Sequence, residues 1–431
     1  MRNTFIIVSL LLISFTRLNS QVLTANASSV DITPPLAMKY TLGGYGDRMN
    51  KPATGIHDRI MAKALSIKSG KHKYMVITLD VLGLPTNIKA DLIKRISAAG
   101  WSHENVMLLP SHSHGSLEME ALNNRNQLNI PQIGIYQPEL VSFLLDKLEL
   151  LVGSVDQNYR EVRIGTGIKT LENLNRNRRK EQNVEKDLIV TRVDLKNGNP
   201  LAVLVNWTAH PTFLGDQDME VSAEWPGYLQ SHLQNLIGYD VTVMYYNGAE
   251  GDQSPVLSSN ESSYQKIETY GKLIAQKAFE VYKQIKPVKV KDFTSSYQHI
   301  QLPEHKAHPS FMKTGGEEYG LTEATVKVVM NMLAPTSTGI GVLKLGDLVI
   351  VGIPGEMTAI LGQQVKAGLK VRGAKQVAIG GLANEWISYI LNKQQYNEGE
   401  GYESSVSFFG PDLGDLLANE AIRTGELVLK K

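Results

Sequence analysis

The 431-residue chain contains no cysteine, and this absence limits its chemistry. Without cysteine there is no disulfide bond, no thiolate metal ligand and no lipid-modified cysteine, so a metal site must use histidine, carboxylate or tyrosine side chains. The formal net charge at pH 7 is only +1, which provides no general field that attracts nucleic acid. The dinucleotide and P-loop fingerprints are also missing from the sequence. We therefore expect no nucleic-acid partner and no nucleotide cofactor.

Hydrophobic runs long enough to cross a membrane are also lacking. The nearest approach is the apolar stretch at residues 5–15, which is shorter than the roughly 20 residues that a membrane span needs. It follows a short segment that contains Arg2, and this arrangement is typical of a secretory signal peptide. We expect residues 1–20 to be a signal peptide and residues 21–431 to form the mature chain, without a transmembrane segment. The protein is then exported to the periplasm or the extracellular space.

Two kinds of apolar pattern alternate along the chain. Short runs with the composition of buried strands begin near residues 73, 106, 162, 188, 201, 241, 340, 348 and 376. Apolar residues recur at helical spacing in residues 87–99, 138–151, 262–282, 322–332 and 358–370, with Ser262 as an expected helix cap. Residues 286–316 are expected to form a long strand followed by an exposed excursion. The alternation predicts an α/β fold, a layered mixed β-sheet with flanking helices. No linker-like segment divides the chain, so we expect a single large catalytic domain.

Four of the strand-like runs each lead into a loop that carries a candidate ligand or nucleophile. The first leads to His112 and His114, the second to His210, the third to Ser254 and the fourth to Glu356. In open α/β sheets, ligands bind in the crevice outside the carboxyl ends of the strands. We therefore expect these four loops to converge on one site.

Three of these residues are suited to a metal site. His112, His210 and Glu356 form the kind of three-ligand set that catalytic zinc takes, with one position left for water. Each also has a structural interpretation, since a histidine after a strand often only holds a hydrogen bond, and a glutamate after Pro-Gly suits the start of a helix. No His-Glu-x-x-His helix settles the geometry. At this point the metal site and the structural interpretation both remain open.

Ser254 lies in a glycine-rich turn and is a candidate nucleophile. A triad of Ser254, His114 and Asp252 is chemically possible, although Asp252 is also placed to close its own turn. The sequence contains no Gly-x-Ser-x-Gly elbow. The pattern favours Ser254 as a group that stabilises an oxyanion beside a metal.

Taken together, the motifs resemble those of a known family, the neutral/alkaline non-lysosomal ceramidases. The His-x-His motif of that family is similar to residues 111–114, and its Asn-Arg element to Asn175-Arg176. Its remaining motifs are similar, in the same order, to residues 206–212, 247–255, 354–358, 381–389, 402–403 and 409–411. The resemblance therefore covers most of the mature chain.

The resemblance implies a secreted zinc amidohydrolase of the family's catalytic-domain fold. It places the metal on His112, His210, Glu356 and Tyr389, and it places His114, Arg176, Ser254 and Tyr402 beside the scissile amide of a ceramide-like lipid. Water activated by Zn²⁺ is expected to attack the acyl carbonyl, with His114 moving protons, and a covalent Ser254 intermediate is the rival scheme. A lipid substrate of this kind is met at a membrane surface. The chain ends soon after the closing motif, so we expect no counterpart of the family's C-terminal β-sandwich domain.

The sequence departs from the family pattern just after His114. Where the family usually has Ser-Gly-Pro-Gly, this chain has Gly115-Ser-Leu-Glu118. A second hypothesis therefore keeps the scaffold but gives it an acidic or glycan-derived substrate, held by Arg176, Arg178 and Arg179 and cleaved by hydrolysis or elimination. A third hypothesis is a binding or structural paralogue without catalysis. Ligation by histidine, glutamate and tyrosine would also accept divalent ions other than zinc.

Overall fold

The fold is that of a computed structural model, which describes residues 22–238, 240–398 and 401–430. The expected signal peptide, residues 1–20, lies outside the described residues. Within the described part of the chain, no helix is long and apolar enough to cross a membrane.

A large mixed sheet forms the first of two β-layers. Its strand order is β11-β9-β8-β6-β1-β3-β4-β5, and β13 (Val288–Lys289) pairs with β6 beside this path. The end pairs β11/β9 and β4/β5 are parallel, whereas the pairs between them are antiparallel. The strands are β1 (Thr24–Asp31), β3 (Met61–Ser69), β4 (His72–Leu79), β5 (Val106–Pro110), β6 (Arg160–Thr170), β8 (Asp187–Leu195), β9 (Pro200–Asn206) and β11 (Thr242–Tyr246).

A smaller sheet stacks on the large one. Its order is β14 (Phe293–Gln301), β15 (Ser337–Leu345), β16 (Leu348–Gly352) and β18 (Gln376–Gly380), with only the β16/β18 pair parallel. One buried cluster contains side chains of both sheets, such as Leu65 and Met107 from the large sheet and Leu343 and Ile350 from the small one. The two sheets therefore share a core.

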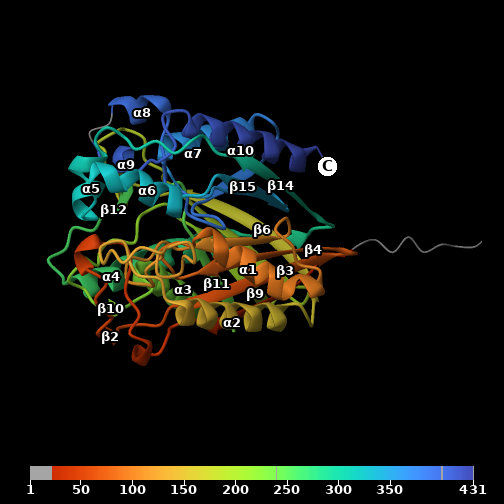
Figure 1. The fold of residues 1–431 in the computed structure, drawn as a ribbon. Coiled ribbons are helices and arrows are strands. Elements are labelled where there is room, and N and C mark those ends of the chain that lie inside the picture. Colours follow the sequence, from red (N-terminus) through yellow and green to blue (C-terminus); the bar gives the residue numbers. More distant parts are fainter. Residues whose placement is uncertain (1–21, 239, 399–400, 431) are drawn as a thin grey trace, which may run out of the picture.

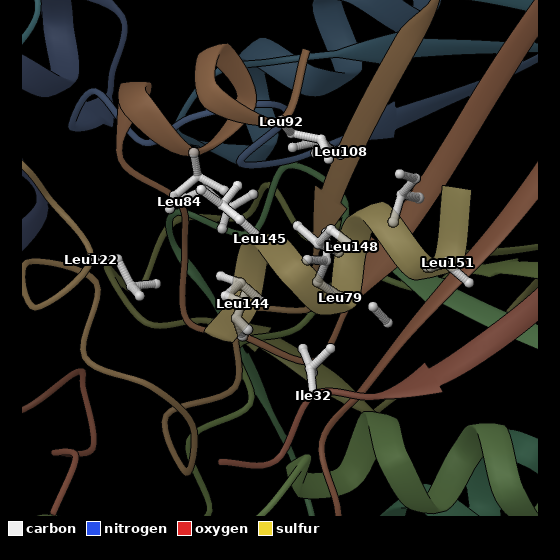
Figure 2. Packing of buried hydrophobic residues seen from close by; sticks show 14 of the residues in the cluster. Ile32, Leu79, Leu84, Leu92, Leu108, Leu122, Leu144, Leu145, Leu148 and Leu151 are labelled. Atoms are coloured by element: carbon white, nitrogen blue, oxygen red, sulfur yellow. The ribbon is translucent and has the colours of Figure 1, made fainter. Parts of the chain in front are cut away.

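Helices cover the outer face of each sheet. Helices α1 (Thr86–Ile96), α2 (Pro138–Val155), α3 (Glu224–Ile237) and α4 (Ser263–Gln284) lie against the large sheet, and α7 (Ala359–Lys370) and α10 (Leu413–Leu429) lie against the small one (Figure 1). Leu144 and Leu148 of α2, for example, pack beside Leu79 of β4 in one buried cluster (Figure 2). The order helix, sheet, sheet, helix confirms the predicted layered α/β fold.

Shorter elements gather at the ends of the strands. They are β2 (Gly55–Ile56), β7 (Asn175–Asn177), β10 (Glu220–Val221), β12 (Gln253–Pro255), β17 (Glu356–Met357), β19 (Tyr389–Ile390), α5 (Gly315–Glu318), α6 (Glu323–Leu333), α8 (Lys393–Glu398) and α9 (Tyr402–Ser405). Among the described residues, four 3-10 helices span Leu36–Met38, Gly46–Arg48, Ser97–Ala99 and Phe311–Lys313. Ser262 caps α4 in a capping box with Gln265, as its sequence predicts. The expected long strand in residues 286–316 is β14, and the excursion after it carries the 3-10 helix at Phe311–Lys313 and the start of α5.

Lys89 of α1 is a buried amine that makes stability depend on pH. Burial lowers its pKa from 10.5 to about 7, although the nearby carboxyl of Glu385 opposes this shift. Its Nζ donates a hydrogen bond to the carbonyl oxygen of His103 at 2.9 Å. Between about pH 7 and 10.5 the unfolded chain therefore binds a proton that the folded protein has released. The free energy of unfolding thus rises with pH across this window.

The Lys89→Met variant is expected to remove that rise. It should stabilise the protein below pH 7 by on the order of 2 kcal/mol, after subtraction of the lost hydrogen bond, and by less as the pH increases. Urea unfolding of both proteins at pH 6.5, 8 and 9.5 measures the difference. A difference that stays constant with pH would contradict the lowered pKa.

Candidate active site

His112 lies in the loop that leaves the carboxyl end of β5. Its backbone has a φ of 71°, a left-handed conformation that is uncommon outside glycine. The turn is held because the His112 N–H donates to the Val81 carbonyl at 3.0 Å, and its Nδ1 lies 2.7 Å from the Leu82 carbonyl oxygen. The bond to Leu82 assigns the proton to Nδ1 and leaves Nε2 free to face the centre of the site.

His210 reaches the same point from the loop after β9 and is fully buried. Its Nδ1 lies 3.1 Å from the carbonyl oxygen of Gln253, and its Nε2 lies 3.0 Å from Oε2 of Glu356. The rings of His112 and His210 are 4.8 Å apart between centroids. Both imidazoles therefore turn Nε2 to a common centre and anchor Nδ1 on a main-chain carbonyl.

Glu356 closes this centre from β17. Its Oε2 lies 3.4 Å from Nε2 of His112 as well as 3.0 Å from that of His210, and its Oε1 accepts a hydrogen bond from Trp386 Nε1 at 2.8 Å. Burial would raise the pKa of Glu356, but the two imidazoles outweigh it and hold the pKa well below its usual value. The carboxylate is therefore kept ionised in a buried position.

His114 belongs to the same cluster but is held differently. Its Nε2 lies 3.4 Å from Nε2 of His112, while its Nδ1 is buried and has no hydrogen-bond partner among the described residues. A Cβ added at Gly44 would lie 2.3 Å from this Nδ1, so the close approach requires glycine there. Burial, reinforced by His112 and His210, holds the pKa of His114 well below 6.5, and burial lowers the pKa of His210 to about 4. Both rings are neutral at pH 7.

Tyr389 joins the cluster through the pairing of β17 with β19, which sets it directly opposite Glu356. Arg178 donates from Nη2 to the Tyr389 hydroxyl at 2.9 Å and to the Gly251 carbonyl at 2.8 Å, and from Nε to Glu403 at 2.5 Å. Burial opposes the charge on Arg178, but Tyr389 and Glu403 outweigh it and raise its pKa. A permanently charged donor therefore lies against the Tyr389 oxygen.

A cavity of about 460 Å³ opens over this cluster. His112, His114, Arg178, Glu356, Tyr389 and Tyr402 line its polar end. Its apolar walls come from four segments. They are α6 with Val326, Val329 and Met330, the 3-10 helix after β14 with Phe311, the loop around Trp386 and the loop around Phe408. The cavity is therefore polar where the histidines meet and has a mixed wall elsewhere, because Glu118, Glu120 and Asn123 also line it.

Two of the sequence-predicted residues are not brought into this cavity. Arg176 and Ser254 face each other in the pairing of β7 with β12, Arg176 is exposed, and neither is among the described residues that line the cavity. Arg178, which the sequence offered only as one of three arginines that hold an acidic substrate in the second hypothesis, lines the cavity instead. The chain contains two consecutive Asn-Arg pairs, Asn175-Arg176 and Asn177-Arg178, and that repetition was the available signal.

The hydrogen bonds of Asp252 explain its place in the turn before Ser254. Its carboxylate accepts from the Ala359 N–H at the start of α7 at 2.9 Å and from the Asn177 amide at 2.8 Å. Across the described residues, no hydrogen bond links Ser254, His114 and Asp252 as a triad would require. Asp252 acts as a structural acceptor that joins β7, β12 and α7.

Two of the four basic side chains in residues 176–180 are paired with carboxylates. Arg178 pairs with Glu403, and Arg179 pairs with Glu181 at 2.9 Å and with Glu403 at 3.4 Å. An acidic substrate would have to compete with these carboxylates. The arrangement does not favour an anionic substrate held by three arginines.

The donor set fits a metal ion. The ligand atoms that His112, His114 and His210 offer all lie within 4.8 Å of one another, and all three side chains are buried. The Glu356 carboxylate lies within 3.4 Å of two of them. Imidazoles with anchored outer nitrogens and a buried carboxylate are the ligands that zinc takes in catalytic sites.

A sequence model described as "Neutral/alkaline non-lysosomal ceramidase, N-terminal" matches residues 25–297 and 321–418. The chain belongs to this family. The neutral ceramidase of Drosophila melanogaster is 28% identical over 128 residues, which cover 28% of this chain and 17% of that protein. The neutral ceramidase of Pseudomonas aeruginosa is 21% identical over 457 residues, which cover 85% of this chain and 66% of that protein.

Solved structures agree with the family assignment. The crystal structure of the Pseudomonas aeruginosa neutral ceramidase superposes with a TM-score of 0.82 at 18% identity, covering 95% of this chain and 75% of that one. A structure described as a ceramidase complexed with C2 gives a TM-score of 0.78 at 17% identity, covering 95% and 76%. At this identity the likeness establishes the fold.

Proposed function

We propose that this protein is an exported, zinc-dependent amide hydrolase that acts on an N-acyl, ceramide-like lipid. The observation that carries the proposal is the buried meeting of His112, His210 and Glu356 at the polar end of a mainly apolar cavity. Membership in the ceramidase family supports the reaction type.

The ligands that we propose are His112, His210, Glu356 and Tyr389. His112 and His210 each anchor Nδ1 on a main-chain carbonyl, as metal-bound histidines do, whereas His114 lacks such a bond within the described structure. When bound, zinc supplies Lewis acidity toward the acyl carbonyl and lowers the pKa of a water molecule. Of the three histidines, His114 is the one that we assign to proton transfer.

The remaining polar groups then have defined tasks. His114, neutral at pH 7, takes a proton from the attacking water and delivers it to the leaving nitrogen. Arg178 and Tyr402 line the cavity beside it and donate hydrogen bonds to the developing oxyanion. In this proposal Arg176 and Ser254 make no contact with the substrate, and no covalent step involves Ser254.

The apolar walls of the cavity suit an acyl chain. Val326, Val329 and Met330 form one wall, and Phe311 and Trp386 form others. Each methylene buried there contributes about 0.8 kcal/mol to binding. A fatty-acyl amide gains from these walls, whereas a glycan does not. Such a lipid would be met at a membrane surface.

A substrate panel tests the proposal. Protein expressed with its leader and purified with zinc is offered ceramide, an N-acyl amino acid, a matching ester and an acidic oligosaccharide, and product release and metal content are measured. We expect fatty-acid release from an N-acyl amide and about one zinc ion per chain. Cleavage of the oligosaccharide alone would support the second hypothesis. The absence of all turnover in zinc-loaded protein would contradict the proposed function.

The same preparation tests export. Cleavage at residues 20–21, detected by N-terminal sequencing of protein collected outside the cytoplasm, is the expected result.

A further inference from the structure

The cavity wall includes a segment that the family's sequence model does not match. The family's sequence model leaves residues 298–320 unmatched, and this stretch contributes Phe311, Glu318 and Tyr319 to the cavity. Because the motifs with proposed catalytic roles all lie elsewhere, the function derived so far makes no use of its two polar side chains.

This segment is bound to the closing part of the chain by several hydrogen bonds. The Lys306 N–H donates to the Phe408 carbonyl at 2.7 Å, and His308 Nε2 lies 2.8 Å from the Tyr396 carbonyl oxygen. Thr314 donates its hydroxyl to Ser405 at the end of α9. Residues 306–319 therefore support α9, the short helix whose first residue is Tyr402.

The last of these contacts lies in the cavity itself. The hydroxyl oxygens of Tyr319 and Tyr402 are 2.8 Å apart. The Glu318 carboxyl, which also lines the cavity, lies 3.4 Å from the Gly46 N–H. The Tyr402 ring also packs edge-on against Tyr389, 5.8 Å between centroids. Tyr402 is thus held between Tyr319 and Tyr389, which is one of the proposed metal ligands.

The direction of these hydrogen bonds follows from the number of protons. Each phenol has a single proton, and in the proposed reaction the oxyanion takes the hydrogen bond that Tyr402 donates. The Tyr319 hydroxyl then donates to the Tyr402 oxygen. A phenol that accepts a hydrogen bond becomes a stronger donor, because hydrogen bonds in a chain polarise one another.

We propose that Tyr319 is a positioning residue for Tyr402. Its hydroxyl holds the Tyr402 oxygen in the cavity that His112, His114 and Glu356 line and strengthens it as a donor to the oxyanion. The inference rests on the proposed amide hydrolysis. It assigns a task to a segment that the family's sequence model leaves unmatched.

The test uses Tyr319→Phe, which removes the hydroxyl and keeps the ring. We expect kcat on the best N-acyl amide to fall about tenfold, with KM changed less than about twofold, because the bond acts on the oxyanion and not on the acyl chain. In a Tyr402→Phe background the same change should have no further effect. Tyr40→Phe is the matched control, because Tyr40 is buried away from the cavity and its hydroxyl has no partner within the described structure.

Thermal unfolding of the two single variants and the double variant gives a readout that does not need activity. The midpoints should be non-additive, because either substitution alone breaks the same hydroxyl pair. An unchanged kcat in Tyr319→Phe, or full additivity with Tyr402→Phe in rate or in midpoint, would overturn the inference. If wild-type protein cleaves no amide, the proposed function fails and the midpoints alone decide whether the two hydroxyls are coupled.

Discussion

Under the proposed function, the His112→Ala variant is expected to lose zinc binding and amide hydrolysis together. His112 supplies a buried Nε2 that lies 3.4 Å from the Glu356 carboxylate, and its other nitrogen is anchored on Leu82. Loss of an outer partner of a metal ligand costs about 10–100-fold in affinity or activity, so loss of the ligand itself should cost at least about 1000-fold in kcat/KM. Metal analysis and fatty-acid release on the same preparation measure both effects.

Two further variants show whether the loss is specific to His112. His72→Ala removes an exposed histidine at the start of β4 and should leave zinc content and rate unchanged. His114→Ala should keep the zinc but lose about 100-fold in kcat, the usual size of a general acid-base contribution. If His114→Ala loses its metal as completely as His112→Ala does, the ion is held by three imidazoles and the proton-transfer assignment is wrong.

The convergence of the site could be predicted from the sequence because strand direction determines it. His112, His210 and Glu356 each follow a buried run, and β5, β9 and β16 each have a parallel neighbour. The carboxyl ends of such strands open into a common crevice. Position along the chain was therefore enough to bring these three together, even though it could not show their distances.

Tyr389 and Arg178 depend on details that no local pattern carries. Tyr389 meets Glu356 only because two-residue strands pair in one register, so its place was implied by the family resemblance alone. The choice between Arg176 and Arg178 depends on where β7 ends, since the strand stops at Asn177 and the chain then turns toward the cavity. A strand of three residues has too little periodicity to predict such an end.

Some elements were not predicted for reasons specific to their sequences. Helix α3 begins with Glu224-Trp-Pro-Gly, which resembles a turn, yet proline is tolerated in a first helical turn because its missing N–H would be unpaired there. Strand β1 consists mostly of small polar residues and is stabilised by pairing with β3 and β6 on both sides. In β1, the hydrogen bonds to two neighbouring strands therefore outweigh the low strand propensity of its residues.

Arg178 and Arg176 are two positions apart, yet we expect their substitution to have very different effects on kcat and on the free energy of unfolding. Arg178→Ala is expected to lower kcat by about 100-fold, because it removes a charged donor from the polar end of the cavity. It should also lower the free energy of unfolding by about 2 kcal/mol, since buried Glu403 keeps only its weaker contact with Arg179. Arg178→Lys keeps the charge but not the forked geometry, so its loss should be intermediate.

Arg176→Ala is the matched control for this pair. Arg176 is exposed on β7, so its removal should change the free energy of unfolding by less than about 0.5 kcal/mol and leave kcat within about twofold. Urea unfolding and steady-state kinetics on both variants measure the contrast. Equal damage from the two substitutions would mean that Arg176 reaches the substrate after a rearrangement of β7, and the assignment of Arg178 as the oxyanion donor would fail. The two arginines are only two positions apart. A roughly 100-fold loss of kcat in Arg178→Ala beside an unchanged kcat in Arg176→Ala would therefore show that the position where β7 ends determines which guanidinium lies in the cavity.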